Sequence, residues 1–316
     1  MANSYVVTGG AGFIGSHIAA HLLQKGHHVR VIDNLSTGKQ SNLDFLSSLN
    51  GNLRIYHNSI TEYEIMRSAF EGVDVVFHHA ALASVPYSVE HPLIVHEHCA
   101  TGTLVVLKAA YDAQVRRVVY ASSSAVYGEN NADIQREDAI PAPISPYGAA
   151  KLAGEYYCQT FTQTYGLETV VLRYFNVFGP RQDPHSPYAA VIPKFIQRMI
   201  HGQPPIIFGD GTQTRDFTPI DNIVHANLLA ADSAAAIGAI INIATGHPIN
   251  LLTLVEKINQ MLGASYKPIF QPPRAGDIQG SQADIERAKK LLAYHPIIDF
   301  DDALRQTIKF LKTQQM

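Results

Sequence analysis

A tyrosine and a lysine four residues apart, Tyr147 and Lys151, have the spacing of an acid–base pair. They stand in SPYGAAKLAGEYY, where the serine and proline are typical of a helix start, so both side chains share one helix face. The ammonium favours the phenolate and lowers the tyrosine pKa. A base near neutral pH needs a pKa drop of about 3 units, roughly 4 kcal/mol. An exposed ion pair supplies only about 0.3–0.5 kcal/mol, so the pair needs a sheltered cleft.

Three consecutive serines, Ser122, Ser123 and Ser124, follow a strand-like run at residues 117–121. Ligands bind at the carboxyl ends of parallel strands in α/β sheets. A hydroxyl there donates to one substrate oxygen and accepts from another hydroxyl. Local turn chemistry explains one of the three serines but not all of them. We therefore expect these serines to work beside Tyr147.

The glycine-rich segment at residues 5–15, YVVTGGAGFIG, predicts a dinucleotide site. Residues 5–8 have the pattern of a buried strand and residues 16–25 that of a helix. Glycines allow close approach to a diphosphate, and the helix start offers unpaired N–H groups. The next strand, residues 28–32, ends in Asp33, whose carboxylate suits the ribose hydroxyls of NAD and repels a 2′-phosphate. This context favours a nucleotide site over a purely structural turn.

Length and composition narrow the class of protein. The 316 residues hold one large α/β unit or two unequal domains. A net charge of −3 does not provide the positive electrostatic field that attracts nucleic acid. The two cysteines, Cys99 and Cys158, are too few for a disulfide framework or a zinc ribbon. No apolar stretch reaches the roughly 20 residues that span a bilayer, and the early first strand leaves no room for a signal peptide. We expect a cytoplasmic protein without a nucleic-acid or membrane partner.

Strand-like and helix-like runs alternate over residues 1–173, which predicts a parallel sheet covered on both faces. We expect an α/β fold, a Rossmann-type doubly wound parallel sheet with a smaller C-terminal α/β substrate lobe. The NAD-binding domain is predicted over residues 1–173, with a return segment near 217–244, and the lobe over 174–316. Expected strands are 5–8, 29–32, 53–57, 73–78, 117–121, 169–173 and 239–244, and expected helices include 93–113, 146–165, 191–201, 251–262 and 301–312.

These segments together resemble the extended short-chain dehydrogenase/reductase family, and within it the UDP-hexose 4-epimerases, over nearly the whole length. The resemblance implies Tyr147 as the catalytic base, Lys151 as its partner and Ser123 as the catalytic serine, followed by Ser124. FHHAALASVP, residues 77–86, resembles the family's loop beside the cofactor. The implied NAD contacts are Gly9, Gly12, Phe13, Ile14, Gly15, Asp33, Asn34, Gly38, Asn58, Ile60, Ala80, Ala81, Ala83, Tyr147 and Lys151.

The second half of the chain resembles the UDP-binding part of these epimerases. In RYFNVFGPRQDP, residues 173–184, Asn176 corresponds to the amide that contacts the nucleotide-sugar diphosphate, and YAAVIPKF resembles the segment that packs on uracil. Arg215 and Arg274 suit a diphosphate because a guanidinium binds bidentately and keeps its charge. The implied substrate contacts are Ser84, Ser123, Tyr147, Asn176, Ala190, Val191, Phe195, Arg215, Arg274, Asp277 and Ser281.

Ser281 addresses the sugar. Glucose- and galactose-restricted epimerases resembling this chain carry a tyrosine there, whereas a small residue leaves room for a 2-acetamido group. The resemblance thus implies an NAD-dependent isomerase that inverts C4 of a UDP-hexose through a transient 4-keto sugar. UDP-GlcNAc and UDP-GalNAc are the expected substrates, with UDP-Glc and UDP-Gal as additional ones.

Several alternatives stay open. A 4,6-dehydratase places Asp-Glu after its catalytic serine or threonine, where this chain has Ser124 and Ala125. A UDP-glucuronate 4-epimerase or decarboxylase is excluded less firmly, and a non-enzymatic NAD-sensing regulator would typically lose the tyrosine and lysine. We expect no metal, because neighbouring histidines on a strand point to opposite faces. The resemblance implies a homodimer through helices 93–113 and 146–165. Cys99 stands where the family commonly carries asparagine, and we expect a packed thiol there because no activating base is identified beside it.

Overall fold

A seven-stranded parallel sheet forms the centre of the protein in the computed structural model, which describes residues 3–128, 134–184, 190–273 and 279–314. The strand order is β11-β6-β5-β4-β1-β2-β3, and every pairing within the sheet is parallel. This order confirms the predicted Rossmann-type fold. The strands are β1 (Ser4–Thr8), β2 (His28–Ile32), β3 (Asn52–Tyr56), β4 (Val75–His78), β5 (Arg117–Ser123), β6 (Glu168–Tyr174) and β11 (Ile240–Ile243).

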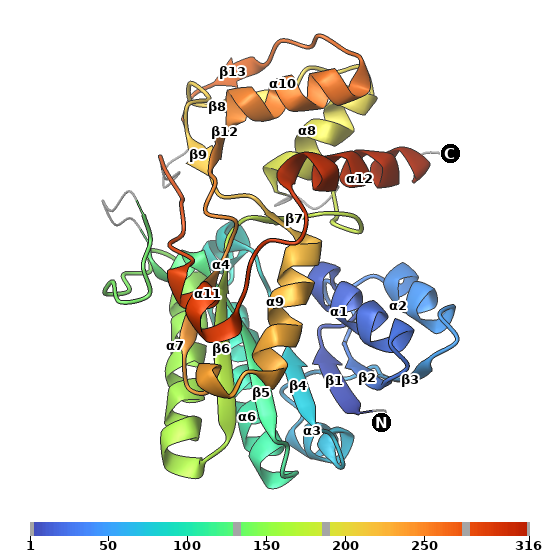
Figure 1. Ribbon diagram of the computed structural model, residues 1–316, viewed down its shortest axis with the longest axis vertical. Coiled ribbons are helices and arrows are strands. Elements are labelled where there is room, and N and C mark those ends of the chain that lie inside the picture. Colours follow the sequence, from blue (N-terminus) through green and yellow to red (C-terminus); the bar gives the residue numbers. More distant parts are fainter. Residues whose placement is uncertain (1–2, 129–133, 185–189, 274–278, 315–316) are drawn as a thin grey trace.

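Helices cover both faces of this sheet (Figure 1). One face packs against α1 (Phe13–Gln24), α2 (Gln40–Ser47), α9 (Ile220–Asp232) and α11 (Glu286–Leu292). The other packs against α3 (Tyr63–Phe70), α6 (Gly102–Asp112) and α7 (Pro146–Thr160). Successive strand residues serve opposite layers: Val6 belongs to the second core and Val7 to the first. Burial on both sides explains why the strands are continuously apolar in sequence.

The chain reverses its direction across the sheet between β1 and β4, which opens a crevice at their carboxyl ends. Two glycines after β1 bring the backbone close at this point. A Cβ on Gly9, whose φ is +70°, would lie 2.7 Å from the Ala80 nitrogen, and one on Gly15 would lie 2.2 Å from the Gly9 oxygen. Only glycine fits at either position.

A smaller lobe stands above the carboxyl ends of the strands in Figure 1. Its core joins α8 (Val191–Ile200), α10 (Leu251–Leu262) and α12 (Phe300–Thr313). Short paired strands edge it: β7 (Val177–Phe178), β8 (Ile206–Phe208), β9 (Thr214–Arg215), β10 (Thr218–Pro219), β12 (Ile249–Asn250) and β13 (Ile269–Gln271). The chain returns from this lobe to the sheet in α9 and β11, and again in α11, which lies outside the expected return segment.

The helix expected over residues 93–113 is interrupted. α5 (Pro92–His96) ends before a π-helical turn, Glu97–Thr101, and α6 begins at Gly102. The wider turn accommodates one extra residue, a local distortion that is frequent at functional sites and invisible to a 3.6-residue pattern. It buries Cys99, whose pKa is raised by burial, which agrees with a packed thiol. The first helix likewise begins at Phe13 rather than at residue 16, because Gly12 serves as its N-cap.

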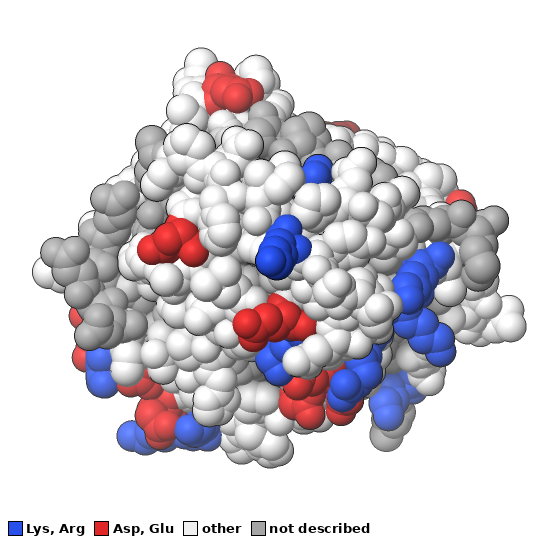
Figure 2. Space-filling model, turned by 90° about the horizontal axis from the view of Figure 1, so that it is seen from above, with Lys and Arg blue, Asp and Glu red and all other residues white. Residues whose placement is uncertain are grey.

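Charged side chains of both signs are interspersed on the face seen from above, over the smaller lobe (Figure 2). No large patch of one sign lies on that described surface. In the part of the chain that the structure describes, no helix has the length and apolar character needed to cross a membrane.

Candidate active site

Tyr147 and Lys151 lie on the first turns of α7. The side chain of Ser145 accepts a hydrogen bond from the Gly148 N–H at 3.1 Å, and Pro146 follows it, so the helix begins where the sequence predicted. Both functional side chains are buried. The Lys151 Nζ donates to the Ala121 carbonyl at 2.9 Å and lies 6.0 Å from the centre of the Tyr147 ring.

Burial controls the protonation of this pair. It raises the pKa of Tyr147 well above its ordinary value, and a hydrogen bond with Ser123 lowers that pKa by less. Burial lowers the pKa of Lys151, against smaller rises caused by Cys99, Cys158 and Glu155. The sheltered cleft that the chemistry requires is present. The protein groups alone favour the neutral phenol, so a base role for Tyr147 requires additional positive charge in the cleft.

A buried ion pair lies directly behind the three serines. Arg173 on β6 binds Glu155 on α7 through Nε–Oε1 at 2.8 Å and Nη2–Oε2 at 2.6 Å, with both side chains buried. Ser122 donates its hydroxyl to the same carboxylate. Ser123 instead faces Tyr147, and its Oγ accepts the Ala125 N–H at 3.1 Å. Of the three serine hydroxyls, that of Ser122 therefore binds the buried Glu155–Arg173 pair and has a structural role.

Four cavities form a continuous cleft beside these residues. The first lies against β2 and the loop after β4, the second beside Lys151, the third beside Ser123, and the fourth within the smaller lobe. Gly9 lines the first and second cavities, Tyr147 the second and third, and Arg215 the third and fourth. The cleft thus runs from the dinucleotide motif past the tyrosine into the second lobe.

The residues of the first and second cavities fit NAD. The Asp33 carboxylate at the end of β2 accepts N–H groups from Ala11 at 2.9 Å and Leu35 at 2.8 Å, and it faces the first cavity. Burial raises the pKa of Asp33, and these two hydrogen bonds lower it. A Cβ on Gly38 would lie 2.7 Å from the Asp33 Oδ1, so glycine keeps that carboxylate in place. Expected contacts that line these cavities are Gly9, Gly12, Phe13, Ile14, Gly15, Asp33, Asn34, Asn58, Ile60, Ala80, Ala81, Ala83, Ser84, Tyr147 and Lys151.

The third and fourth cavities hold most of the residues expected to bind substrate. Ser84 differs from the rest, because its hydroxyl accepts the Tyr87 N–H at 3.2 Å as the N-cap of α4 (Val85–Glu90). Asn176 has a φ of +35° and bonds the Asp216 carbonyl at 3.4 Å. Expected residues lining the third and fourth cavities are Ser123, Ser124, Tyr147, Asn176, Ala190, Val191, Phe195 and Arg215.

Four expected residues are not placed in the cleft. Gly38 lies against the Asp33 carboxylate and does not line any of the four cavities. Arg274 and Asp277 lie outside the described residues. Ser281 is buried, and its backbone pairs with Thr214 at 3.2 Å and Asp216 at 2.8 Å, on either side of Arg215. Ser281 is not among the described residues that line the four cavities.

Several lining residues were missed in the sequence. His79 and Tyr174 stand at the carboxyl ends of β4 and β6 and share a hydrogen bond of 2.9 Å, and both line the second cavity. Burial lowers the pKa of His79 to about 3. The rule that strand ends bind ligands could have found both residues. His98, Gln182 and Gln213 also line the cleft, without any comparable signal in the sequence.

The histidines do not assemble a metal centre in the described parts of the chain. His78 bonds Thr8 at 2.8 Å and Thr103 at 3.1 Å, so both ring nitrogens have partners. Within the described ranges, no group of three or more histidine, cysteine, aspartate or glutamate side chains is arranged to hold a metal ion.

Comparisons with known proteins agree with this geometry. The sequence model of the "NAD dependent epimerase/dehydratase family" matches residues 5–244. A UDP-glucose 4-epimerase of Mycolicibacterium smegmatis is 35% identical over 311 residues, which cover 98% of each chain. The solved structure of a UDP-N-acetylglucosamine 4-epimerase from Methanobrevibacter ruminantium M1, in complex with UDP-N-acetylmuramic acid, superposes with a TM-score of 0.94 at 42% identity. The match covers 99% of this chain and 100% of that one.

A third match contains the dinucleotide. A mutant UDP-glucuronic acid 4-epimerase from Bacillus cereus, in complex with a fluorinated UDP-glucuronic acid and NAD, superposes with a TM-score of 0.90 at 32% identity. The match covers 98% of this chain and 99% of that one.

Proposed function

We propose that this chain, which belongs to the NAD dependent epimerase/dehydratase family, interconverts UDP-GlcNAc and UDP-GalNAc by inversion at C4, with UDP-Glc and UDP-Gal as further substrates. The chain is an NAD-dependent enzyme of the UDP-sugar 4-epimerase type. One observation carries the proposal. Tyr147 stands where the second and third cavities meet, within reach of both a dinucleotide and a sugar.

Each residue has a separate role in the proposed reaction. Bound NAD would accept the hydride from C4 of the sugar and return it to the opposite face. Tyr147, as phenolate, takes the proton of the C4 hydroxyl through Ser123 and gives it back. The Lys151 ammonium favours that phenolate. Arg215 and Asn176 hold the diphosphate while the sugar turns. Because the hydride returns, turnover needs no added NAD.

The composition of the third cavity argues against the rival reactions. Among its described lining residues, Arg215 is the one cationic side chain, and no aspartate or glutamate is present. A uronic acid would call for a cation at C6 in addition to those at the diphosphate. A 4,6-dehydratase would need an acid and a base near C5 and C6, where Ser124 and Ala125 stand.

The choice of an N-acetylated sugar is supported by two observations. Ser281 is small, and its backbone pairs on either side of Arg215, next to the segment proposed to bind the diphosphate. The UDP-N-acetylglucosamine 4-epimerase of Methanobrevibacter ruminantium is 42% identical to this chain over nearly its whole length.

A product assay tests the function directly. The purified protein, without added NAD, is incubated separately with UDP-GlcNAc, UDP-Glc and UDP-GlcA, and the products are separated chromatographically. We expect C4 epimers from the first two and none from the third. Turnover of UDP-GlcA alone, to an epimer or a pentose, would replace the proposal with a glucuronate 4-epimerase or decarboxylase. Tight NAD binding without any product would indicate a non-enzymatic regulator.

Ser281→Tyr tests the sugar preference. The bulkier side chain should abolish turnover of UDP-GlcNAc while sparing UDP-Glc, whereas Ser281→Ala should preserve both activities. Residual UDP-Glc turnover also reports that the variant folds. Equal loss on both substrates would count against a role of residue 281 in sugar selection.

We also propose that two copies associate through the predicted segments, which form α5, the π-helical turn, α6 and α7, together with the adjoining α4. α7 contacts both α4 and α5, and Val89, Leu93 and Tyr156 leave 64%, 84% and 53% of their surfaces exposed around this contact. Light scattering after size-exclusion chromatography should give twice the mass of the chain, and Leu93→Glu should give a monomer. A monomeric parent protein would refute this part of the proposal.

A further inference from the structure

One buried acceptor in the fourth cavity has no partner. Gln213 is only 6% exposed. Its amide nitrogen donates to the Phe208 carbonyl at 2.6 Å, while its Oε1 is buried without a hydrogen-bond partner in the described structure. An unpaired acceptor is costly in a folded protein, so it calls for an explanation. Because Gln213 lines the fourth cavity, a bound molecule could supply the missing donor.

The fourth cavity has the composition of a site for a flat ring. Most of its lining residues are apolar, and four of them are phenylalanines. Its polar residues, among those described, are Asn176, Gln213 and Arg215. Aromatic walls with few polar groups are typical of sites in which packing supplies affinity and a few hydrogen bonds supply specificity.

Gln213 and Arg215 are spaced so that their side chains can contact the base and the diphosphate of one nucleotide. Backbone bonds from Thr214 to Gln279 and from Asp216 to Ser281, at 2.9 and 2.8 Å, hold this segment extended. Side chains two residues apart on an extended chain point to the same side, about 6–7 Å from each other. Arg215 also lines the third cavity and Gln213 does not. Arg215 therefore lies toward the proposed sugar site. Gln213 lies farther from it, between the fourth cavity and a neighbouring cavity lined by Gln279.

We propose that Gln213 reads the base of the nucleotide: its Oε1 accepts the N3–H of a uracil-type ring and thereby excludes cytosine. The inference rests on the proposed function, because it assumes a nucleoside diphosphate in this cleft. The Phe208 carbonyl fixes the amide orientation, since only the NH₂ end of Gln213 can donate to it. Gln213 therefore presents its Oε1, a hydrogen-bond acceptor, to the cavity. Uracil presents a donor at N3, whereas cytosine presents a lone pair, which would face the glutamine oxygen.

Calorimetric binding of UMP and CMP to the whole protein tests the proposal. We expect the parent protein to bind UMP at least about tenfold more tightly than CMP. Gln213→Met keeps the length of the side chain and removes the acceptor. It should weaken UMP about tenfold and leave CMP within about twofold, so the ratio collapses. A purely structural role through Phe208 would weaken both nucleotides equally and overturn the proposal.

Gln279→Met is the matched control. Gln279 is exposed and its amide nitrogen donates to Thr212 at 3.1 Å. It lines a neighbouring cavity that Gln213 also borders, but it does not line the fourth cavity. The same chemical change at this position should leave the ratio of UMP to CMP affinity unaltered. A collapse of the ratio in this control would show that the effect is not specific to Gln213.

A modified ligand tests the idea without any variant. 3-Methyl-UMP lacks the N3–H, so the parent protein should bind it at least about tenfold more weakly than UMP, and Gln213→Met should not add to that loss. Equal binding of UMP and 3-methyl-UMP by the parent protein would overturn the proposal.

Neither ligand carries a sugar, so the result is independent of the epimerase assay. Loss of epimerase activity on every sugar with an intact preference for UMP would refute the proposed function alone. Intact epimerase activity with equal UMP and CMP affinities would refute the role of Gln213 alone.

Discussion

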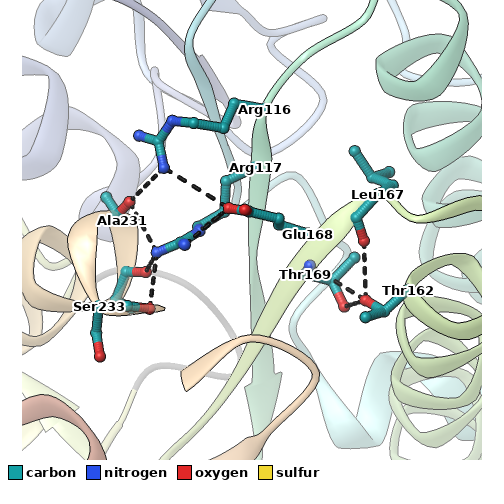
Figure 3. A network of polar contacts seen from close by, with 9 residues as sticks. Arg116, Arg117, Thr162, Leu167, Glu168, Thr169, Ala231 and Ser233 are labelled. Atoms are coloured by element: carbon teal, nitrogen blue, oxygen red, sulfur yellow. Dashed lines mark hydrogen bonds and ion pairs between the residues drawn. The ribbon is translucent and has the colours of Figure 1, made fainter. Parts of the chain in front are cut away.

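The two ends of the neighbouring strands β5 and β6 differ in what their polar groups do. At the amino ends, Arg117 bonds Glu168 at 2.9 and 2.7 Å, and its Nη1 donates to the carbonyls of Ala230, Ala231 and Ser233 at the end of α9 (Figure 3). These contacts satisfy carbonyls that the helix leaves unpaired. At the carboxyl ends, the same strands place Ser123 and Tyr174 against open cavities.

The difference separates stability from chemistry within one sheet. The amino-end cluster consists of Arg116, Arg117, Glu168 and the last carbonyls of α9, and its groups bind one another. At the carboxyl end, hydroxyl and imidazole groups line the cleft, and the buried Arg173–Glu155 pair lies behind them. Substitutions at the two ends should therefore affect different measurements.

Tyr147→Phe should give the largest effect, and only on catalysis. Loss of the phenolic base should lower kcat by about 10²–10⁴-fold, with UMP affinity and the free energy of unfolding nearly unchanged. Stopped-flow turnover and calorimetry check this. Tyr120→Phe is the control, because its buried hydroxyl contacts the Lys151 carbonyl at 3.3 Å outside the cleft, and it should keep its turnover. A fully active Tyr147→Phe would exclude Tyr147 as the base.

Arg117→Met should do the opposite. It removes the buried cation from Glu168, which then keeps the longer contact with Arg116 at 3.7 Å, and it takes the side-chain donor from the Ala230 and Ser233 carbonyls. The free energy of unfolding in urea should therefore fall by about 2–3 kcal/mol. The kcat of the folded protein should stay within about twofold of the parent value. If Arg117→Met lowered kcat without lowering the free energy of unfolding, the proposed division between a stabilising end and a catalytic end of the strands would be wrong.

Acid should destabilise the carboxyl end. The pKa of His79 is about 3 in the folded protein against about 6.5 when unfolded, so the unfolded chain binds the extra proton between these values. The stability contribution is present above pH 6.5 and declines as the pH falls. We expect a loss of about 1–2 kcal/mol between pH 6.5 and pH 5, since His79 is partly open to the cleft.

His79→Gln should flatten that pH dependence, measured as urea unfolding at several pH values. His28→Gln, at an exposed position, should leave it unchanged. An identical slope in the two variants would mean that other groups, such as His17 or His78, whose pKa values are also lowered by burial, dominate acid unfolding.

Lys39→Ala should have the smallest effect. Its ion pair with Asp183 at 2.9 Å resembles that of Arg117 in chemistry, but the two side chains are 45% and 34% exposed. Such pairs contribute less than about 0.5 kcal/mol, so urea unfolding should barely change. A loss as large as that of Arg117→Met would show that burial does not explain the difference between these two pairs.

Short-range patterns predicted much of the cleft. Gly9 to Gly15, Asp33 and the pair Tyr147 and Lys151 could be found because each motif depends on residues close in sequence, within one turn or one helix. Strand alternation and apolar periodicity likewise predicted the sheet. The π-helical turn at residues 97–101 could not be predicted, because the packing of Gly102 against Ile60 involves residues distant in the chain.

Other features depend on contacts between distant segments. Arg117 was visible only as the start of a strand, and its partners at residues 230–233 lie more than a hundred positions away. Ser281 is expected at the sugar. Its burial, through backbone pairing between β9 and the segment around residue 281, joins residues distant in the sequence and could not be predicted from local patterns. Gln213 gave no signal in the sequence, since its significance comes from an acceptor left unpaired after the second lobe packs.

By itself, the amino-acid sequence determined the parallel sheet, the dinucleotide turn and the spacing of tyrosine and lysine, because these follow from local geometry and the burial of periodic apolar residues. The tertiary structure alone decided the protonation of Tyr147, the join between the cavities and the orientation of the Gln213 amide. Each of these depends on which distant groups exclude water or supply hydrogen bonds, and that is set only when both lobes are packed together.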